Sequence, residues 1–124
     1  MVVVDSCGWF EWFTDGPLAD QYQQYLEDQQ ELLVPVIVLY EVYKVLKGQV
    51  GEEKAILAFG HMKCSTVIPL DENLALLAAD VSLRQNLAMA DAIVYAAALA
   101  NNCNLITSDR DLDALPQVTF IHKA

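Results

Sequence analysis

Four carboxylates stand where an acidic side chain is unexpected. Asp5 ends the apolar run "VVVD" and Asp109 ends "LITSD". Glu41 lies inside the apolar segment "IVLYEVYKVL", and Asp91 opens the Ala-rich segment "MADAIVYAAA". A buried carboxylate is costly unless it is paired, protonated or bound to a cation. Because carboxylate oxygens are the ligands that Mg²⁺ and Mn²⁺ prefer, these four residues predict a divalent-metal site.

Each of these acids also has a structural explanation. An acidic residue that ends a strand often forms a turn. Asp91 could cap a helix and meet the positive end of its dipole. Glu41 could pair with Lys44 or Lys47, about one turn further along a helix. The case for a metal site therefore depends on whether the four acids lie together, where they would repel one another without a cation.

The apolar pattern predicts strands that alternate with helices. Short strands are expected at residues 2–4, 31–34, 65–70, 104–109 and 118–122. Helices are expected at residues 6–13, 17–30, 35–48, 51–63, 71–86 and 89–102. This alternation implies a parallel sheet with helices on both faces, whose active crevice lies beyond the carboxyl ends of the strands. Asp5 and Asp109 are then expected to be neighbours at that edge.

Composition limits the class of protein. A chain of 124 residues, 55% of them hydrophobic, is expected to form a single domain over residues 1–124. We expect it to be cytoplasmic, because it has no membrane-span or signal-peptide pattern. We expect three reduced, mostly buried cysteines, Cys7, Cys64 and Cys103. The net charge of -10 argues against a general nucleic-acid coat protein, and fits divalent metals, a basic partner or simple solubility.

The order of "VVVDS", "LYEVYKVL", "MADAIVYAAA" and "LITSDRDL" resembles a PIN domain over essentially the whole chain. More narrowly, it resembles the toxin subunit of VapBC-type toxin–antitoxin pairs. The resemblance implies a three-layer α/β/α sandwich with a mostly parallel central sheet. It also implies that Asp5, Glu41, Asp91 and Asp109 bind Mg²⁺ or Mn²⁺ in an endoribonuclease. Such toxins are commonly homodimers, silenced by a small DNA-binding antitoxin, whose inhibitory tail we expect to be basic.

Further polar residues flank the four acids. The candidate auxiliary groups are Ser6, Thr107, Ser108 and Asp111. The candidate phosphate contacts are Lys44, Arg84 and Arg110. Ordinary turn hydroxyls, a helix cap and solvated surface charges explain the same residues without a function. The sequence departs from the family at Leu112, where Phe is common, and in the segment 84–90, which is poor in basic residues.

Two other functions fit the same sequence. One is a catalytically silent PIN-like module that binds RNA or protein, and the other is a nuclease that acts on DNA. Trp9 and Trp12 could stack on bases, but their aromatic neighbours favour core packing. Tyr40 and Tyr43 flank Glu41 and are expected to pack beside the site.

Overall fold

A computed structural model describes residues 1–123 and contains a five-stranded parallel sheet. The strands are β1 (Val2–Val4), β2 (Leu32–Pro35), β3 (Thr66–Ile68), β4 (Asn104–Thr107) and β5 (Val118–Phe120). Their order in the sheet is β3-β2-β1-β4-β5, and each neighbouring pair is parallel. In the centre, Val3 pairs with Leu33 of β2 on one side and with Leu105 of β4 on the other. The predicted strands are all present.

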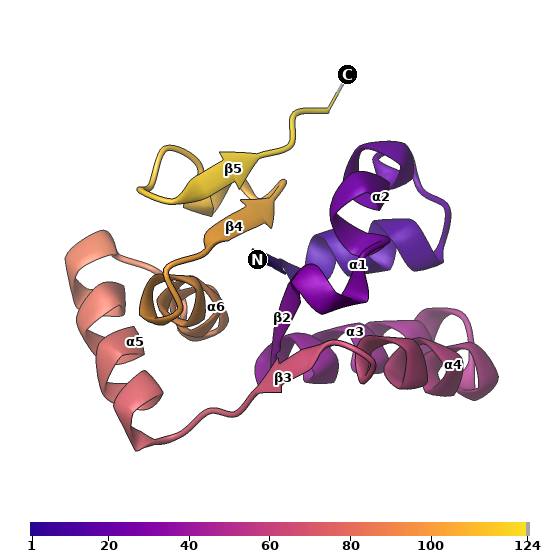
Figure 1. Cartoon of the computed structure of the whole chain (residues 1–124), viewed down its shortest axis with the longest axis horizontal. Coiled ribbons are helices and arrows are strands. Elements are labelled where there is room, and N and C mark those ends of the chain that lie inside the picture. Colours follow the sequence, from indigo (N-terminus) through magenta and orange to yellow (C-terminus); the bar gives the residue numbers. More distant parts are fainter. Residues whose placement is uncertain (124) are drawn as a thin grey trace.

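Helices cover both faces of this sheet. They are α1 (Ser6–Phe13), α2 (Ala19–Leu26), α3 (Val36–Gln49), α4 (Glu52–Met62), α5 (Glu72–Gln85) and α6 (Met89–Ala100). Figure 1 shows α5 and α6 on one side of the sheet, with α1 and α2 on the other and the α3–α4 pair beside them. The predicted three-layer α/β/α sandwich is therefore confirmed.

Local sequence explains where the helices begin and end. The Asp5 carboxylate caps α1 by accepting a 2.8 Å hydrogen bond from the Ser6 N–H. The segment 17–30, predicted as one helix, instead forms α2 and then a short 3₁₀ turn at Gln29–Glu31. Leu26 is the last buried side chain of α2, so the polar residues after it have no core contact to extend the helix.

The core forms around α6, whose residues from Ala92 to Ala98 are all buried. Trp9 is fully buried and stacks on Phe13 with a ring-centroid distance of 5.8 Å. Trp12 is half-buried and lies edge-on to Trp9 at 6.3 Å. Core packing, rather than base stacking, thus explains both tryptophans.

The three cysteines are free but differ in exposure. Cys103 is buried, Cys7 is half-buried and Cys64 is exposed, so the expectation of burial was wrong for Cys64. Within residues 1–123, the longest apolar helices are still too short to cross a bilayer.

Candidate metal centre

The ends of β1 and β4 place two acids side by side. The Asp5 N–H donates to the Ile106 carbonyl at 3.0 Å, which continues the β1–β4 pairing beyond the strand end. The Thr107 hydroxyl donates to Asp5 Oδ2 at 2.8 Å and accepts from the Asp109 N–H at 3.0 Å. One buried hydroxyl thus links the two strand ends that carry Asp5 and Asp109.

The other two acids come from helices. Asp91 lies in the first turn of α6, where Ala88 occupies the N-cap position. Glu41 lies in the middle of α3, and both side chains are half-buried. Asp91 is therefore not the N-cap of α6, although its charge still faces the positive end of the helix dipole.

Glu41 has no ion-pair partner among residues 1–123. Lys44 instead donates to the Tyr40 hydroxyl at 3.3 Å, and Lys47 pairs with Glu52 at 3.4 Å. The explanation of Glu41 by pairing with a lysine of its own helix is therefore wrong, which leaves a half-buried carboxylate facing other acids.

Burial and repulsion by neighbouring acids raise the pKa values of Asp5, Glu41 and Asp91. Burial raises the pKa of Asp91 to about 6, with further contributions from the negative charges of Asp109, Asp5, Asp111 and Glu41. Burial also raises the pKa of Asp5, and hydrogen bonds from Thr107 and Ser6 oppose this shift. The pKa of Glu41 is raised by burial and by the charge of Asp5. The structure thus brings the four predicted acids within range of one another's charges.

Three of the acids come close enough to share one cation. One oxygen from each of Asp91, Asp109 and Asp111 lies within 4.8 Å of the other two. The Asp111 N–H also donates to Asp109 Oδ1 at 3.0 Å, within the 3₁₀ turn Arg110–Leu112. Asp5 and Glu41 stand outside this group of three. Asp111, an auxiliary candidate by sequence, is therefore more central than expected.

The donor set fits a hard divalent cation. All the grouped ligands are carboxylate oxygens, and Mg²⁺ is typically bound by one or two carboxylates with several waters. Thiol and imidazole groups, which would favour Zn²⁺, are absent from this group of three residues.

The residue that sequence reasoning missed is Tyr22. Its hydroxyl donates to Ser108 Oγ at 2.9 Å, immediately before Asp109 in the chain. In the sequence, Tyr22 looks like one more apolar residue of an amphipathic helix, and no local signal distinguishes it.

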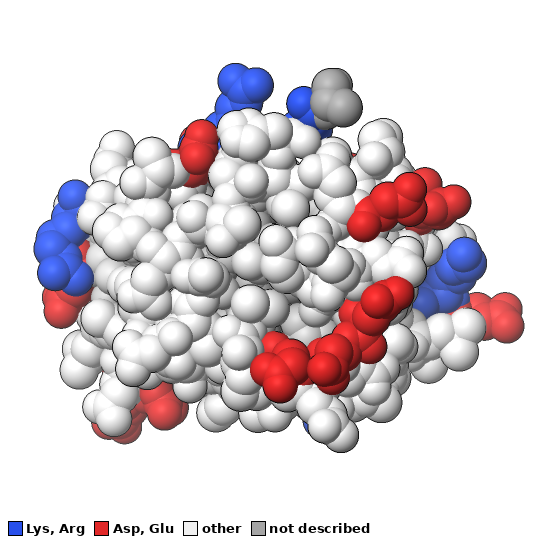
Figure 2. Space-filling view, turned by 45° about the horizontal axis from the view of Figure 1, so that its top comes forward, with Lys and Arg blue, Asp and Glu red and all other residues white. Residues whose placement is uncertain are grey.

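Three basic residues were candidate phosphate contacts, and all are exposed: Lys44, Arg84 and Arg110. Among residues 1–123, none of the three forms an ion pair with the acids of the site. On the face shown in Figure 2, acidic side chains form a row, and basic ones lie towards the edges of the view. Binding of RNA by these residues stays a prediction.

The sequence and fold together define the class of protein. Residues 2–118 match the PIN domain family. Since this match spans nearly the whole chain, the chain belongs to the PIN domain family. No curated protein matches the chain.

Solved structures share the fold at low sequence identity. A toxin–antitoxin complex from Klebsiella pneumoniae aligns with a TM-score of 0.84 and 19% identity, covering 100% of both chains. VapC20 from Mycobacterium tuberculosis, a toxin that cleaves the sarcin-ricin loop, aligns with a TM-score of 0.73 and 15% identity, covering 85% of this chain and 87% of that one. VapBC2 from Rickettsia felis, bound to promoter DNA, aligns with a TM-score of 0.76 and 14% identity over 98% of each chain.

Proposed function

We propose that this chain is a divalent-metal-dependent endoribonuclease and the toxin of a toxin–antitoxin pair. The observation that carries the proposal is the cluster of acids at the carboxyl ends of β1 and β4 and on the adjacent helices α3 and α6. Within it, burial and the neighbouring negative charges raise the pKa values of Asp5, Glu41 and Asp91. In a module that only binds a partner, such a cluster would merely repel itself, whereas a metal site needs the carboxylates as ligands.

The chain's residues have separate tasks in this proposal. The ligands of Mg²⁺ or Mn²⁺ would come from Asp5, Glu41, Asp91 and Asp109, joined by Asp111. When bound, the ion supplies a more acidic water and stabilises negative charge on the scissile phosphate. Thr107 orients Asp5 through its 2.8 Å hydrogen bond. A carboxylate of the cluster accepts the proton from the attacking water.

RNA is the proposed substrate because VapC20, which shares the fold, is a toxin that cleaves the sarcin-ricin loop. The acids of this edge repel phosphates until a cation neutralises them, so RNA affinity should depend on the metal. The test is to incubate purified protein with total RNA and with DNA in Mn²⁺, Mg²⁺ or EDTA. We expect RNA cleavage with metal only. Cleavage of DNA alone would favour the DNA nuclease, and metal-independent RNA binding without cleavage would favour the silent module.

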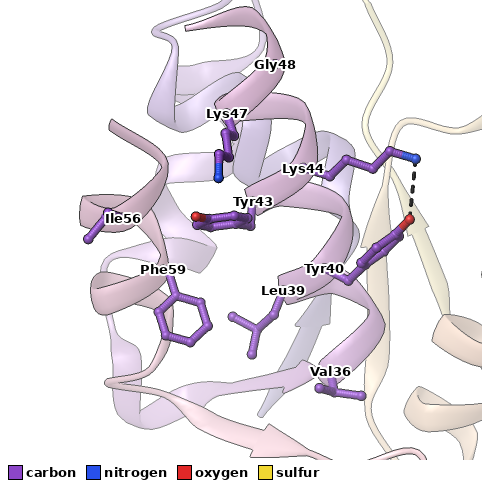
Figure 3. A pocket seen from close by; sticks show the side chains of 9 residues that line it. All are labelled: Val36, Leu39, Tyr40, Tyr43, Lys44, Lys47, Gly48, Ile56 and Phe59. Atoms are coloured by element: carbon purple, nitrogen blue, oxygen red, sulfur yellow. Dashed lines mark hydrogen bonds between the residues drawn. The ribbon is translucent and has the colours of Figure 1, made fainter. Parts of the chain in front are cut away.

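A protein partner is supported by an apolar groove between α3 and α4, with a volume of about 860 Å³. Figure 3 shows Phe59 of α4 and Leu39 of α3 side by side in this groove, with the Tyr43 ring above them. Phe59 and Ile56 remain 43% and 54% exposed, respectively, although both are apolar. We assign the groove to an antitoxin segment, because the structures with this fold include toxin–antitoxin complexes.

Tyr40 and Tyr43 diverge from the expectation that both pack beside the acids. Tyr43 faces α4 and forms an edge-on contact with Phe59 at 6.3 Å. Tyr40 is 59% exposed and turns to the other side with Lys44 (Figure 3). Tyr40 lines the groove and Glu41, a member of the acidic cluster, is the next residue of α3. We therefore propose that an antitoxin segment bound in the groove extends a basic tail towards the acids.

Antitoxin binding has a direct test. We expect the chain to co-purify with the product of an adjacent reading frame, and the complex to weaken as salt rises. An antitoxin affinity that changes neither with salt concentration nor when the acids are substituted would contradict the basic-tail proposal. A homodimer, also expected from the resemblance, is tested by light scattering, and the cytoplasmic location expected from the sequence pattern is tested by cell fractionation.

A further inference from the structure

We infer that Tyr22 is a positioning residue, which holds the strand end carrying Asp109 in the geometry that binds the metal. The inference rests on the proposed function, because it concerns the same carboxylates. Tyr22 lies on α2, 86 residues before Ser108 in the chain, and its hydroxyl forms no hydrogen bond with a carboxylate of the site.

Polar contacts connect Tyr22 to both strand ends. Its hydroxyl donates to Ser108 Oγ at 2.9 Å, and the Ser108 hydroxyl donates to Cys7 Sγ at 3.4 Å. Cys7 Sγ lies 3.7 Å from Thr107 Oγ1 and 3.8 Å from Asp5 Oδ2. Tyr22 therefore contacts the residue just before Asp109 and, through the thiol, the hydroxyl that orients Asp5.

The fold holds Tyr22 in one place. Its side chain is fully buried, and Gly8 provides the space, since a Cβ there would collide with the Tyr22 ring. Burial, and then the neighbouring Cys7, raise the pKa of Tyr22 well above its usual value, so its hydroxyl remains protonated and can donate. A fixed donor of this kind restricts the rotation of Ser108.

Loss of this donor should change the metal site without emptying it. In Tyr22→Phe, the ring still fills the space beside Gly8, but the Ser108 hydroxyl loses its donor. Groups that orient metal ligands typically contribute about 10-fold or more to metal affinity. We therefore expect Tyr22→Phe to weaken Mn²⁺ binding by about 10-fold.

Tyr95 provides a matched control. It is also a buried tyrosine, and its hydroxyl donates one 2.9 Å hydrogen bond, to the Pro116 carbonyl. Tyr95→Phe therefore removes a hydrogen bond of the same length, also part-buried, that does not lead to Ser108. If Tyr22 only stabilised the fold, both variants would unfold at lower temperatures in EDTA, and Mn²⁺ affinity would stay equal to the wild type in both.

The experiment measures Mn²⁺ binding to the metal-free full chain by titration calorimetry, and thermal unfolding in EDTA. We expect weaker Mn²⁺ binding in Tyr22→Phe and in Ser108→Ala but not in Tyr95→Phe. The double variant Tyr22→Phe/Ser108→Ala should bind about as weakly as Ser108→Ala alone, because the short contact of the Tyr22 hydroxyl is the 2.9 Å bond to Ser108, whereas Cys7 Sγ lies 3.6 Å away.

Three results would overturn the inference. One is a Mn²⁺ affinity of Tyr22→Phe equal to that of the wild type. If Tyr22→Phe does not fold, a Mn²⁺ affinity of Ser108→Ala equal to that of the wild type would overturn the inference instead. If the wild type binds no Mn²⁺, the metal centre of the proposed function fails and the inference fails with it. Wild-type binding with unchanged variants would reject the inference alone.

Discussion

The carboxylate edge and the α3–α4 groove differ in chemistry although both use α3. The edge takes Glu41 from α3 and adds acids from the ends of β1 and β4 and from α6. The groove takes Leu39 and Tyr43 from the same helix and is mainly apolar. A hollow of about 860 Å³ is therefore not where the proposed chemistry lies. The topology of a parallel sheet locates that chemistry better than cavity size does.

This difference implies that the two regions can be disabled separately. Catalysis should depend on charge and on hydrogen-bonded geometry at the edge. Partner binding should depend mainly on apolar contact in the groove, since buried aromatic side chains dominate most interfaces, with a smaller contribution from the acids through the basic tail. Substitutions on either side of α3 therefore test the assignment of each function.

The largest expected effect is on RNA cleavage in Asp109→Asn. This change removes a charge from the group of three acids and should lower cleavage in Mn²⁺ by about 100-fold or more, because metal-assisted stabilisation amounts to several kcal/mol. Initial rates on a labelled RNA give the measurement. Asp113→Asn serves as the control, because Asp113 is exposed and lies outside the group of three acids. This variant should cleave RNA at the wild-type rate. Equal loss in both variants would argue against a site at Asp109.

The next effect concerns the groove. Phe59→Asp places a charge against Tyr43 and should weaken antitoxin binding by about 2 kcal/mol, roughly 30-fold, while RNA cleavage remains normal. Leu57→Asp is the matched control, because Leu57 is exposed on the same helix but does not line the groove. Calorimetry with the purified antitoxin would measure both. If Phe59→Asp left the antitoxin affinity unchanged, the groove would not be the antitoxin-binding site.

The smallest effect is on the stability of the metal-free protein. Burial and repulsion raise the pKa of Asp91 from 3.8 to about 6, so between these values the folded chain binds more protons than the unfolded one. Its free energy of unfolding should therefore fall as the pH rises from about 4 to about 6. The shift corresponds to at most about 3 kcal/mol, which solvent screening at a half-buried carboxyl reduces to roughly 1 kcal/mol.

Denaturant unfolding in EDTA across this pH range measures the effect. Asp91→Asn should flatten the pH dependence and raise stability at pH 7 by roughly 1 kcal/mol, because it removes the repelled charge. The same variant should lose most of the stabilisation that Mn²⁺ gives the wild type. Stability of the wild type that rises with pH would contradict the raised pKa of Asp91.

Several features of the fold and site are predictable from the sequence. The run "VVV" and the segment "NLITSD" have the composition of buried strands, and helices between strands require a parallel sheet. From this alone, Asp5 and Asp109 are expected at one edge, where the structure indeed places them beside Thr107.

Other features depend on side-chain directions and long-range contacts that periodicity does not determine. Asp111 joins Asp91 only because the 3₁₀ turn after β4 directs it back. Tyr22 reaches Ser108 across 86 residues, through a space that Gly8 leaves open. The direction of Tyr43 towards α4 follows from helix packing, which the sequence of α3 alone does not specify.

The most direct test of the metal centre is an anomalous diffraction map from crystals of the metal-free chain soaked in Mn²⁺. We expect a Mn²⁺ peak among the carboxylates at the ends of β1 and β4, beside Asp109, and its disappearance in Asp109→Asn. No peak at this edge, at a Mn²⁺ concentration that supports RNA cleavage, would contradict this expectation.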